Sequence, residues 1–254
     1  MNRLRQLVKA LRVLLAADRR WLRALRQGVA PSLEHLRVLR LMSAETVVDI
    51  GANRGQFALA VRHVLPQAAI DSFEPLPEPA AVFRRVFAGD TRATLHACAI
   101  GERAGTTAMH VSARDDSSSL LPIGREQTRI FPGTQEAGRA AIEVRRLDDV
   151  LTPEQITAPA LLKLDVQGYE LQALRGCETL LDAFAWVYCE CSFVALYEGQ
   201  ALADEVIAWL RERGLRLLGV YNMAYDHDGR AVQADFLFGR WKQEQQRDSS
   251  LRSE

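Results

Sequence analysis

The stretch 161-LLKLDVQGYELQALRG-176 carries side chains that can hold or move a proton. Lys163 and Asp165 lie two residues apart in a predicted strand, so both face the same side of it. They stand at its carboxyl end, the edge at which open α/β sheets bind ligands. Glu170 follows in the first turn of the predicted next helix, where a carboxylate suits the helix dipole. These residues indicate a reacting edge or, as the alternative, a structural ion pair beside a helix-terminal acid.

An earlier glycine turn has the form of a nucleotide-binding site. In 47-VVDIGANRGQF-57 an apolar strand runs into Gly51 and Gly55, which let the backbone bend sharply and approach a ligand. The amides that start the following helix point at that place. Glu74, about 20 residues further on at the end of the next strand, can accept both ribose hydroxyls of an adenosine. The arrangement fits the adenosine half of NAD or of S-adenosylmethionine; a generic strand-to-helix connection is the alternative.

Three details separate the candidate cofactors. Asn53 stands at the second glycine position of a dinucleotide fingerprint, which loses the close approach of a pyrophosphate. The Gly-Lys-Ser/Thr of a phosphate-binding loop is absent from the turn. Asp49, two residues before the first glycine, would repel a pyrophosphate but favour the ammonium and sulfonium of S-adenosylmethionine. We therefore expect S-adenosylmethionine, with an NAD-linked oxidoreductase and a non-catalytic cofactor-binding scaffold as the alternatives.

The elements that must position these groups alternate along the chain. Strands are predicted at 47–51, 69–73, 93–100, 106–111, 142–146, 160–165, 185–191, 215–223 and 232–239. Helices are predicted at 3–26, 32–42, 55–65, 79–88, 148–151, 168–182 and 200–213. Such alternation favours an α/β fold with a mostly parallel sheet and helices on both faces. The C-terminal hairpin adds an antiparallel strand, and we expect a basic helical extension (1–43), one domain (44–241) and a polar tail (242–254).

Five motifs follow one another between about residues 45 and 239: D-I-G-A-N-x-G, F-E-P, a serine-rich run, L-K-L-D-V-Q-G-Y-E and Q-A-D-F-L-F. In this combination the chain resembles the FkbM family of S-adenosylmethionine-dependent methyltransferases. The family's K-x-D-x-x-G-x-E element is matched at Lys163, Asp165, Gly168 and Glu170, and Gln167 stands where many members carry Glu. The resemblance implies a Rossmann-like class I methyltransferase fold with seven strands, the last antiparallel. It also implies O-methylation of a hydroxyl on a small-molecule or glycan acceptor, such as a sugar or a secondary metabolite.

Methyl transfer to a hydroxyl requires an aligned acceptor, exclusion of water and a destination for the hydroxyl proton. We expect Asp165 at the reacting centre, as base or as acceptor-orienting group. Lys163 would lower the pKa of the hydroxyl or fix Asp165. Glu190, at the end of the next strand in 188-YCECSF-193, is a second catalytic candidate or a surface acid. A divalent cation between Asp165 and Glu190 is compatible with these residue types, but no metal-ligand motif indicates one.

The remaining expected contacts divide between cofactor and acceptor. For S-adenosylmethionine we expect the methionine part at Asp49, Gly51, Asn53 and Gly55, the ribose at Glu74, and the adenine beside Cys98 and Ala99. For the acceptor we expect Ser117, Ser118, Ser119 and Glu170, with the arginines at 125, 129 and 139. These serines and arginines lie in a long polar segment, 112–140, which is typical of functional loops. We predict an acceptor-binding lid there; a mobile solvated loop is the alternative.

Basic residues gather at the N-terminus. The first 40 residues hold ten basic and two acidic side chains, a net +8 that leaves −8 on the remainder of a formally neutral chain. The leucines of 3–26 recur at helical spacing with arginines between them, as in a basic amphipathic helix. Such a helix could make peripheral contact with an anionic membrane or an acidic partner, self-associate, or pack on the core.

The sequence also bears on compartment and partners. No apolar run reaches the length of a membrane span, and the N-terminus lacks the cleavage site of a signal peptide. The four cysteines, Cys98, Cys177, Cys189 and Cys191, form no CxxC motif, so we expect reduced thiols and no zinc. An Asn/Asp-Pro-Pro-aromatic element of base-modifying enzymes is absent, which disfavours nucleic acid as acceptor. We expect a cytoplasmic protein, with the basic segment as a means of contact at the inner membrane surface.

Overall fold

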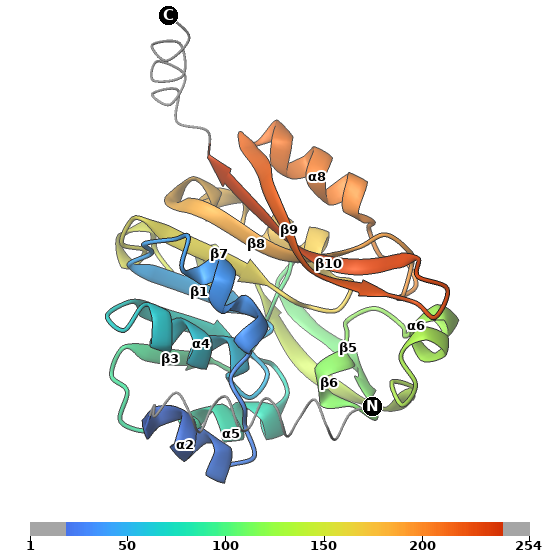
Figure 1. Ribbon diagram of the computed structural model, residues 1–254, viewed down its shortest axis with the longest axis horizontal. Coiled ribbons are helices and arrows are strands. Elements are labelled where there is room, and N and C mark those ends of the chain that lie inside the picture. The colour runs from blue at the N-terminus through green and yellow to red at the C-terminus, as the bar shows by residue number, and fades with distance from the viewer. Residues whose placement is uncertain (1–18, 241–254) are drawn as a thin grey trace, which may run out of the picture.

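The computed structural model describes residues 19–240 (Figure 1), so most of the predicted helix at 3–26 and the tail lie outside the described residues. Its main sheet has the strand order β3-β2-β1-β7-β8-β10-β9. The strands are β1 (Thr46–Ile50), β2 (Ala69–Phe73), β3 (Ala93–His96), β7 (Ala160–Leu164), β8 (Phe184–Ser192), β9 (Leu215–Tyr225) and β10 (Ala231–Arg240). Neighbours are parallel except β10, which is antiparallel to both β8 and β9. The predicted seven-stranded Rossmann-like sheet with an antiparallel closing strand is confirmed.

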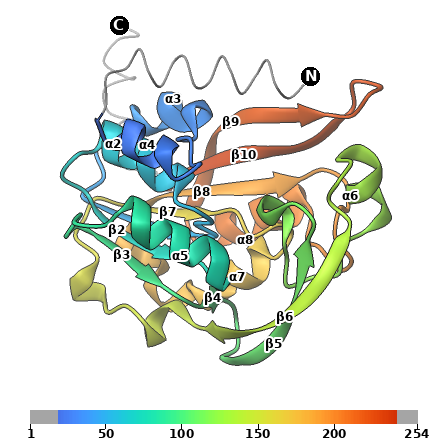
Figure 2. The same ribbon diagram turned by 90° about the horizontal axis from the view of Figure 1, so that it is seen from below.

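Helices cover both faces of this sheet (Figure 2). The α-helices are α2 (Arg19–Arg26), α3 (Leu36–Leu39), α4 (Gln56–Val64), α5 (Pro77–Val86), α6 (Arg125–Ile130), α7 (Glu170–Gly176) and α8 (Ala203–Glu212). Short 3-10 helices lie at Leu33–His35, Asp115–Ser117, Leu147–Asp149, Pro153–Gln155 and Glu178–Ala183. The predicted helix at 148–151 is thus a 3-10 turn.

The central strands are buried on both faces because α-helices pack on each side. Every residue of β1 is buried, and so is every residue of β7. Since side chains alternate along a strand, Val47 and Leu161 join the core under α4 and α5, whereas Val48 and Leu162 join the core under α7 and α8. An uninterrupted apolar run of this kind is typical of a parallel strand covered on both faces.

The described part of the N-terminal extension packs on the domain. Trp21 and Leu39 are buried in the same core as α4, and the Trp21 indole N–H donates to the carbonyl of Leu59 at 3.3 Å. The predicted helix at 32–42 is wrong in detail: a 3-10 turn leads into the four-residue α3, and the Ser32 side chain makes no capping hydrogen bond. This break turns the chain toward the carboxyl edge of the sheet.

The predicted strand at 93–100 is also wrong, because the chain changes sheets within it. After β3, β4 (Ala99–Ile100) joins a second sheet of order β4-β6-β5, with β5 (Gly105–Ser112) and β6 (Glu136–Arg145) antiparallel to each other. The predicted strand at 142–146 in fact begins at Glu136. The segment 112–140 is therefore no structureless loop: it holds a 3-10 turn, α6 and the start of β6. The exposed first half of β6 gave no apolar pattern to reveal it.

The turn after β7 differs from the prediction in a way that shapes the site. Gln167 and Gly168 adopt left-handed backbone conformations, with φ of 55° and 94°. The helix expected from 168 to 182 consequently begins at Glu170, and it ends at Gly176 before a separate 3-10 turn. Two left-handed residues after a strand reverse the chain sharply, and this brings the Gln167 side chain back beside Asp165.

Candidate active site

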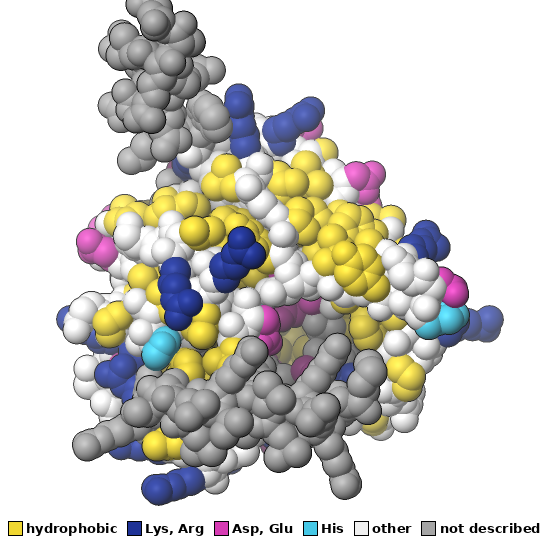
Figure 3. Space-filling view, in the orientation of Figure 1, with side chains coloured by type: hydrophobic (Ala, Val, Ile, Leu, Met, Phe, Trp, Pro, Cys, Tyr) yellow, Lys and Arg dark blue, Asp and Glu magenta, His cyan; other side chains and the backbone are white. Residues whose placement is uncertain are grey.

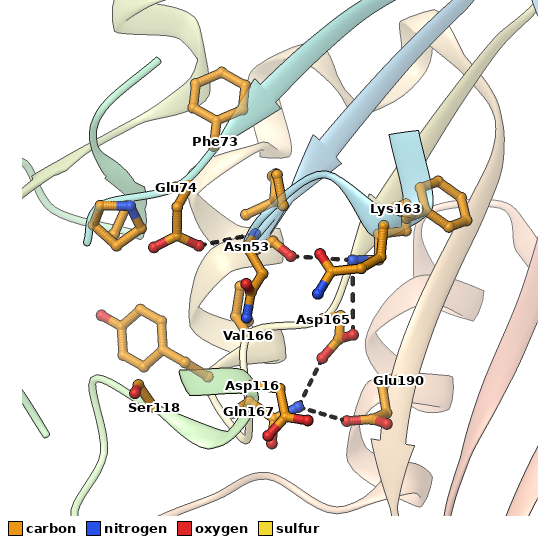
Figure 4. Close-up of a pocket in the computed structure, with 18 of the residues that line it drawn as sticks. Asn53, Phe73, Glu74, Asp116, Ser118, Lys163, Asp165, Val166, Gln167 and Glu190 are labelled. Carbon is orange, nitrogen blue, oxygen red and sulfur yellow. Dashed lines mark hydrogen bonds and ion pairs between the residues drawn. The ribbon is translucent and has the colours of Figure 1, made fainter. Parts of the chain in front are cut away.

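A cavity of about 410 Å³ opens where β1, β2, β7 and β8 end. Figure 4 shows Glu74 at one side of it and Asp165, Gln167 and Glu190 at the other, with Asn53 between them. From outside, acidic side chains are visible within a hollow near the centre of the molecular face (Figure 3). Carboxylates from separate strands therefore meet at one edge of the sheet, as expected for a ligand site in an open α/β fold.

Glu74 is held at the end of β2 by backbone amides. Its Oε2 accepts the N–H of Asn53 at 3.0 Å and its Oε1 accepts the N–H of Leu76 at 2.8 Å. Burial raises the pKa of Glu74 to about 7, and these two N–H groups oppose the shift. The side chain still lines the cavity, so its remaining lone pairs can accept hydrogen bonds from a ligand.

The glycine turn fits tightly between β1 and its neighbours. Gly51 has φ 82°, and a Cβ there would overlap the carbonyl oxygen of Asp165. Gly55 has φ 92°, and a Cβ there would lie 2.7 Å from the Phe87 ring. Asn53 lies between them at φ 47°, and its buried Oδ1 has no hydrogen-bond partner among the described residues. The turn thus holds one buried, unsatisfied acceptor beside the cavity that Asn53 lines.

Asp49 and Lys163 form a buried ion pair beneath the cavity. The Lys163 Nζ lies 3.1 Å from Asp49 Oδ1 and 3.7 Å from Asp165 Oδ2, and it donates to the carbonyl of Gly51 at 3.3 Å. Burial lowers the pKa of Lys163, but the carboxylates of Asp49 and Asp165 outweigh it and hold that pKa above its ordinary value. Asp49 is fully buried and does not line the cavity, so it acts on the site through Lys163.

Gln167 joins two acids at the opposite side of the cavity. Its Nε2 donates to Asp165 Oδ1 at 2.8 Å and to Glu190 Oε2 at 3.1 Å, and its Oε1 accepts the hydroxyl of Tyr197 at 2.8 Å. Glu190 Oε1 also accepts from Gln233 at 2.7 Å. Burial first, and then the nearby Asp165, raise the pKa of Glu190 well above its ordinary value. A neutral amide therefore keeps two carboxyl groups close together and in fixed orientation.

Comparison with known proteins separates the candidate enzyme classes. Residues 49–217 match the methyltransferase FkbM domain. The chain belongs to the FkbM methyltransferase family. It is 29% identical over 199 residues to the 2-O-methyltransferase NoeI of Sinorhizobium fredii, covering 74% of this chain and 82% of that protein. It is 27% identical over 203 residues to the 31-O-demethyl-FK506 methyltransferase FkbM of Streptomyces tacrolimicus, covering 71% and 76%.

Among solved structures, an rRNA methylase from Streptococcus thermophilus matches with a TM-score of 0.46 at 10% identity, over 82% of this chain and 94% of that chain. Membership of the FkbM family makes the protein an S-adenosylmethionine-dependent methyltransferase rather than an NAD-linked oxidoreductase.

The cavity of this FkbM methyltransferase has a donor and acceptor set that fits S-adenosylmethionine. The unpaired Asn53 Oδ1 suits the ammonium of the methionine part, since a buried acceptor without a partner gains most from a charged donor. Glu74 suits the two ribose hydroxyls. Ala99 and Ile100, where the chain leaves the main sheet, line the cavity with apolar side chains that are compatible with an adenine ring.

Some predicted contacts of this FkbM methyltransferase lie near the cavity without lining it. Cys98 is buried beside it, and burial raises the pKa of its thiol to about 11. Gly55 caps α4 behind the turn. Glu170 accepts the N–H groups of Val166 and Gly168 at 3.0 and 3.1 Å, and burial raises its pKa to about 7. Glu170 thus braces the turn that carries Asp165 and Gln167.

The three serines of the polar segment have different surroundings. Ser118 lines the cavity, together with Asp116 and Leu120. Ser119 is fully buried, and its hydroxyl donates to the Gln167 carbonyl at 2.6 Å. The carbonyl of Ser117 accepts the Tyr197 hydroxyl at 3.1 Å. The segment is thus hydrogen-bonded onto the site as one of its walls, and none of the arginines at 125, 129 and 139 reaches the cavity.

Among the cavity-lining residues that sequence reasoning missed, three are polar and come from distant parts of the chain. His35 comes from the N-terminal extension, Asn222 from β9 and Asp235 from β10. Asp235 lies within the Q-A-D-F-L-F motif, so a polar residue in an apolar strand was the available signal. The residues around His35 in the sequence give no sign of a functional role, because its contacts are made with residues far along the chain.

Two negative findings complete the description. Among residues 19–240, the one group of His, Cys, Asp and Glu side chains with the spacing of a metal site is Asp226, His227 and Asp228, at the β9–β10 turn and away from the cavity. In the same range, no helix has the length and apolar character needed to cross a membrane.

Proposed function

We propose that the enzyme methylates a hydroxyl oxygen of a small-molecule or glycan acceptor, such as a sugar or a secondary metabolite. The observation that carries this proposal is the Asp165–Gln167–Glu190 cluster, which offers oriented carboxyl oxygens on the side of the cavity opposite Glu74. A hydroxyl acceptor must be oriented by a hydrogen-bond acceptor, and a fixed carboxylate supplies one. The names of both relatives, a 2-O-methyltransferase and a 31-O-demethyl-FK506 methyltransferase, support oxygen as the target.

The catalytic role we assign to Asp165 follows from its contacts. The carboxylate is held by Gln167 through Oδ1 and by Lys163 near Oδ2, and its side chain remains 37% exposed. It can therefore accept the hydrogen bond of an acceptor hydroxyl and aim the oxygen lone pair. Lys163 fixes the carboxylate from below, and Glu190 completes the polar wall.

The cofactor supplies an electrophilic methyl group when bound. Asn53 and the Gly51 turn would hold its amino-acid end, and Glu74 its ribose, while Asp49 keeps Lys163 in place. Leu76 and the second sheet close the cavity beside β2, which limits water near the reacting atoms.

We further propose that the polar segment selects the acceptor through Asp116, Ser118 and Leu120. Leu120→Trp would narrow that wall, so we expect a higher KM for the acceptor and unchanged affinity for S-adenosylmethionine. An equal loss of acceptor binding and of S-adenosylmethionine binding would count against this role.

The basic N-terminal segment remains a proposed site of electrostatic contact with anionic membrane or of self-association. In α2 the apolar residues Trp21 and Ala24 are buried on the domain, whereas Arg23 and Arg26 are exposed. This favours surface contact by arginines over insertion of the apolar face. Sedimentation with anionic liposomes should fall when residues 1–30 are removed; binding that survives truncation would reject the membrane contact, and light scattering tests self-association.

The test of the function is product analysis. Candidate sugars, glycans and metabolites are incubated with the enzyme and methyl-labelled S-adenosylmethionine, and products are examined by mass spectrometry. We expect label on a hydroxyl oxygen. Label on nitrogen or carbon would contradict the proposal.

A further inference from the structure

His35 reaches the cavity from outside the region matched to the family, which begins at residue 49. Its Nδ1 lies 3.0 Å from the Tyr188 hydroxyl, 3.3 Å from Asn222 Nδ2 and 3.5 Å from Asp235 Oδ2. The side chain is 12% exposed. A histidine that is almost buried and surrounded on one nitrogen by three polar groups is held in a single orientation.

Aromatic packing fixes the same orientation. The Phe57 and Tyr188 rings meet the imidazole edge to face, at centroid distances of 5.3 and 5.6 Å. Within the described residues, every polar contact of His35 uses Nδ1, and Nε2 has no hydrogen-bond partner. Because His35 lines the cavity, Nε2 is the nitrogen left to meet a ligand.

Asp235 is in turn fixed behind the imidazole. Its Oδ2 accepts from Asn222 Nδ2 at 2.7 Å, and its side chain is 13% exposed. A carboxylate on the Nδ1 side favours the tautomer with hydrogen on Nδ1, which leaves a lone pair on Nε2. It also stabilises the imidazolium that forms when Nε2 takes a proton.

We propose that the His35–Asp235 pair is the proton acceptor of the methyl transfer, while Asp165 orients the acceptor hydroxyl. This inference rests on the proposed function. The hydroxyl oxygen forms a bond to the methyl carbon, the carbon–sulfur bond breaks with its electron pair on sulfur, and the hydroxyl proton passes to Nε2 of His35. The imidazolium later returns that proton to water.

The charges around His35 are compatible with this role. Asp235 on β10 and Tyr188 on β8 contact its Nδ1 side, and Asp49 on β1 lies within electrostatic reach. Lys163, beyond the Phe57 ring, neutralises Asp49 through their ion pair. Glu34 precedes His35 in the same turn and also lines the cavity. A carboxylate thus faces the ring on its Nδ1 side, away from Nε2.

The first test needs no acceptor. The protein is labelled with 15N-histidine, saturated with S-adenosylhomocysteine and observed by NMR, and the His35 signals are assigned by their loss in His35→Asn. We expect the neutral ring to carry its hydrogen on Nδ1. We also expect Asp235→Asn to move the tautomer balance toward hydrogen on Nε2. A wild-type ring with its hydrogen on Nε2, or a tautomer balance that Asp235→Asn leaves unchanged, would overturn the proposal.

The second test uses the hydroxyl compound that the wild-type enzyme methylates. His35→Asn keeps a polar group on the Nδ1 side but removes the base, so kcat should fall about 10²- to 10⁴-fold while the Kd for S-adenosylmethionine stays unchanged. The wild-type rise of kcat with pH should vanish with it. His227→Gln, in the exposed β9–β10 turn, is the control with unchanged kcat.

The outcomes distinguish a failure of the His35 role from a failure of the proposed function. Full kcat in His35→Asn, or a loss explained by weaker cofactor binding, would overturn the role of His35. Failure of the wild-type enzyme to methylate any hydroxyl would instead reject the proposed function before a variant is compared. If His35→Asn fails to fold, Asp235→Asn, which preserves side-chain shape, carries the same kinetic test: kcat should fall while the Kd for S-adenosylmethionine stays unchanged.

Discussion

The proposed cofactor side and the proposed acceptor side of the cavity are built differently. Around Gly51, Asn53 and Glu74, backbone groups and one carboxylate make the contacts, within a strand-turn-helix unit and the strand after it. Around Asp165 and His35, side chains from distant segments form the surface. A site built from backbone groups tolerates little variation, because a substitution that alters the turn conformation changes all of its contacts at once. Side-chain networks can change one residue at a time, so we expect substrate choice to reside there.

The largest expected effect is a loss of turnover without a loss of cofactor affinity, and it comes from the side that holds Asp165. Asp165→Asn should lower kcat about 10²- to 10⁴-fold, since the amide cannot accept and orient the hydroxyl as the carboxylate does. Affinity for S-adenosylmethionine, measured by calorimetry, should stay within severalfold. Full activity in this variant would remove Asp165 from the reacting centre.

On the proposed cofactor side we expect a loss of cofactor affinity with little loss of turnover. Glu74→Ala should weaken binding of S-adenosylmethionine about tenfold to a hundredfold, the worth of charge-assisted hydrogen bonds. Turnover at saturating cofactor should change much less. Glu78→Gln, an exposed acid on α5, is the matched control. A Glu74 variant with normal Kd would show that the ribose lies elsewhere.

The raised pKa of Glu74 also predicts that cofactor affinity depends on pH. Burial raises the pKa of Glu74 to about 7, and the protonated form is a poorer acceptor for ribose hydroxyls. Affinity for S-adenosylmethionine should therefore increase as pH rises through 7, with proton release detectable by calorimetry in buffers of different ionisation enthalpy. Glu74→Gln should bind with little pH dependence; an unchanged slope in that variant would place the titrating group elsewhere.

A smaller effect is expected from the residue that joins the acids. Gln167→Glu replaces the shared amide by a third carboxyl group, so kcat should fall about tenfold at neutral pH and recover partly at lower pH, where a proton can be shared. Gln67→Glu, at an exposed position outside the cavity, is the control. A neutral-pH rate equal to wild type would show that the amide is not needed.

The last expected effect concerns the stability of the fold rather than activity. Burial raises the pKa of Glu170 to about 7, above its unfolded value of 4.5. Its contribution to stability is therefore full below 4.5 and is lost as pH rises through 7. Glu170→Gln keeps an acceptor for the N–H groups of Val166 and Gly168 but does not titrate. From pH 4.5 to 8, urea unfolding should show the variant gaining up to about 3 kcal/mol relative to wild type; parallel pH curves would refute this.

The two sides also differ in how well the sequence predicts them. β1, the glycine turn and Glu74 could be predicted because each depends on near neighbours: an apolar strand, residues that accept positive φ, and an acid after the next strand. The positions of Asp165 and Glu190 at the cavity could be predicted in the same way, since parallel strands end at one edge, whereas their catalytic roles stay predictions. Asp49 lies on the predicted strand, but it does not line the cavity as expected. Its burial depends on the ion pair with Lys163 from another strand, which the local sequence does not reveal.

What escaped prediction depends on contacts between distant segments. His35 becomes part of the site only when the extension folds over β8 and β10, and Asp235 meets it from the far end of the chain. Gln167 matters because a left-handed turn brings its amide between two acids. The departure of the chain from the main sheet after His96 likewise depends on pairing with β6, whose exposed residues carry no strand pattern.

A structure of the enzyme with S-adenosylhomocysteine tests the division of the cavity most directly. We predict both ribose hydroxyls within hydrogen-bond distance of Glu74, the amino group at Asn53 Oδ1, and the sulfur facing the side that holds Asp165 and His35. A ribose bound away from Glu74, or a sulfur directed away from Asp165, would contradict the account.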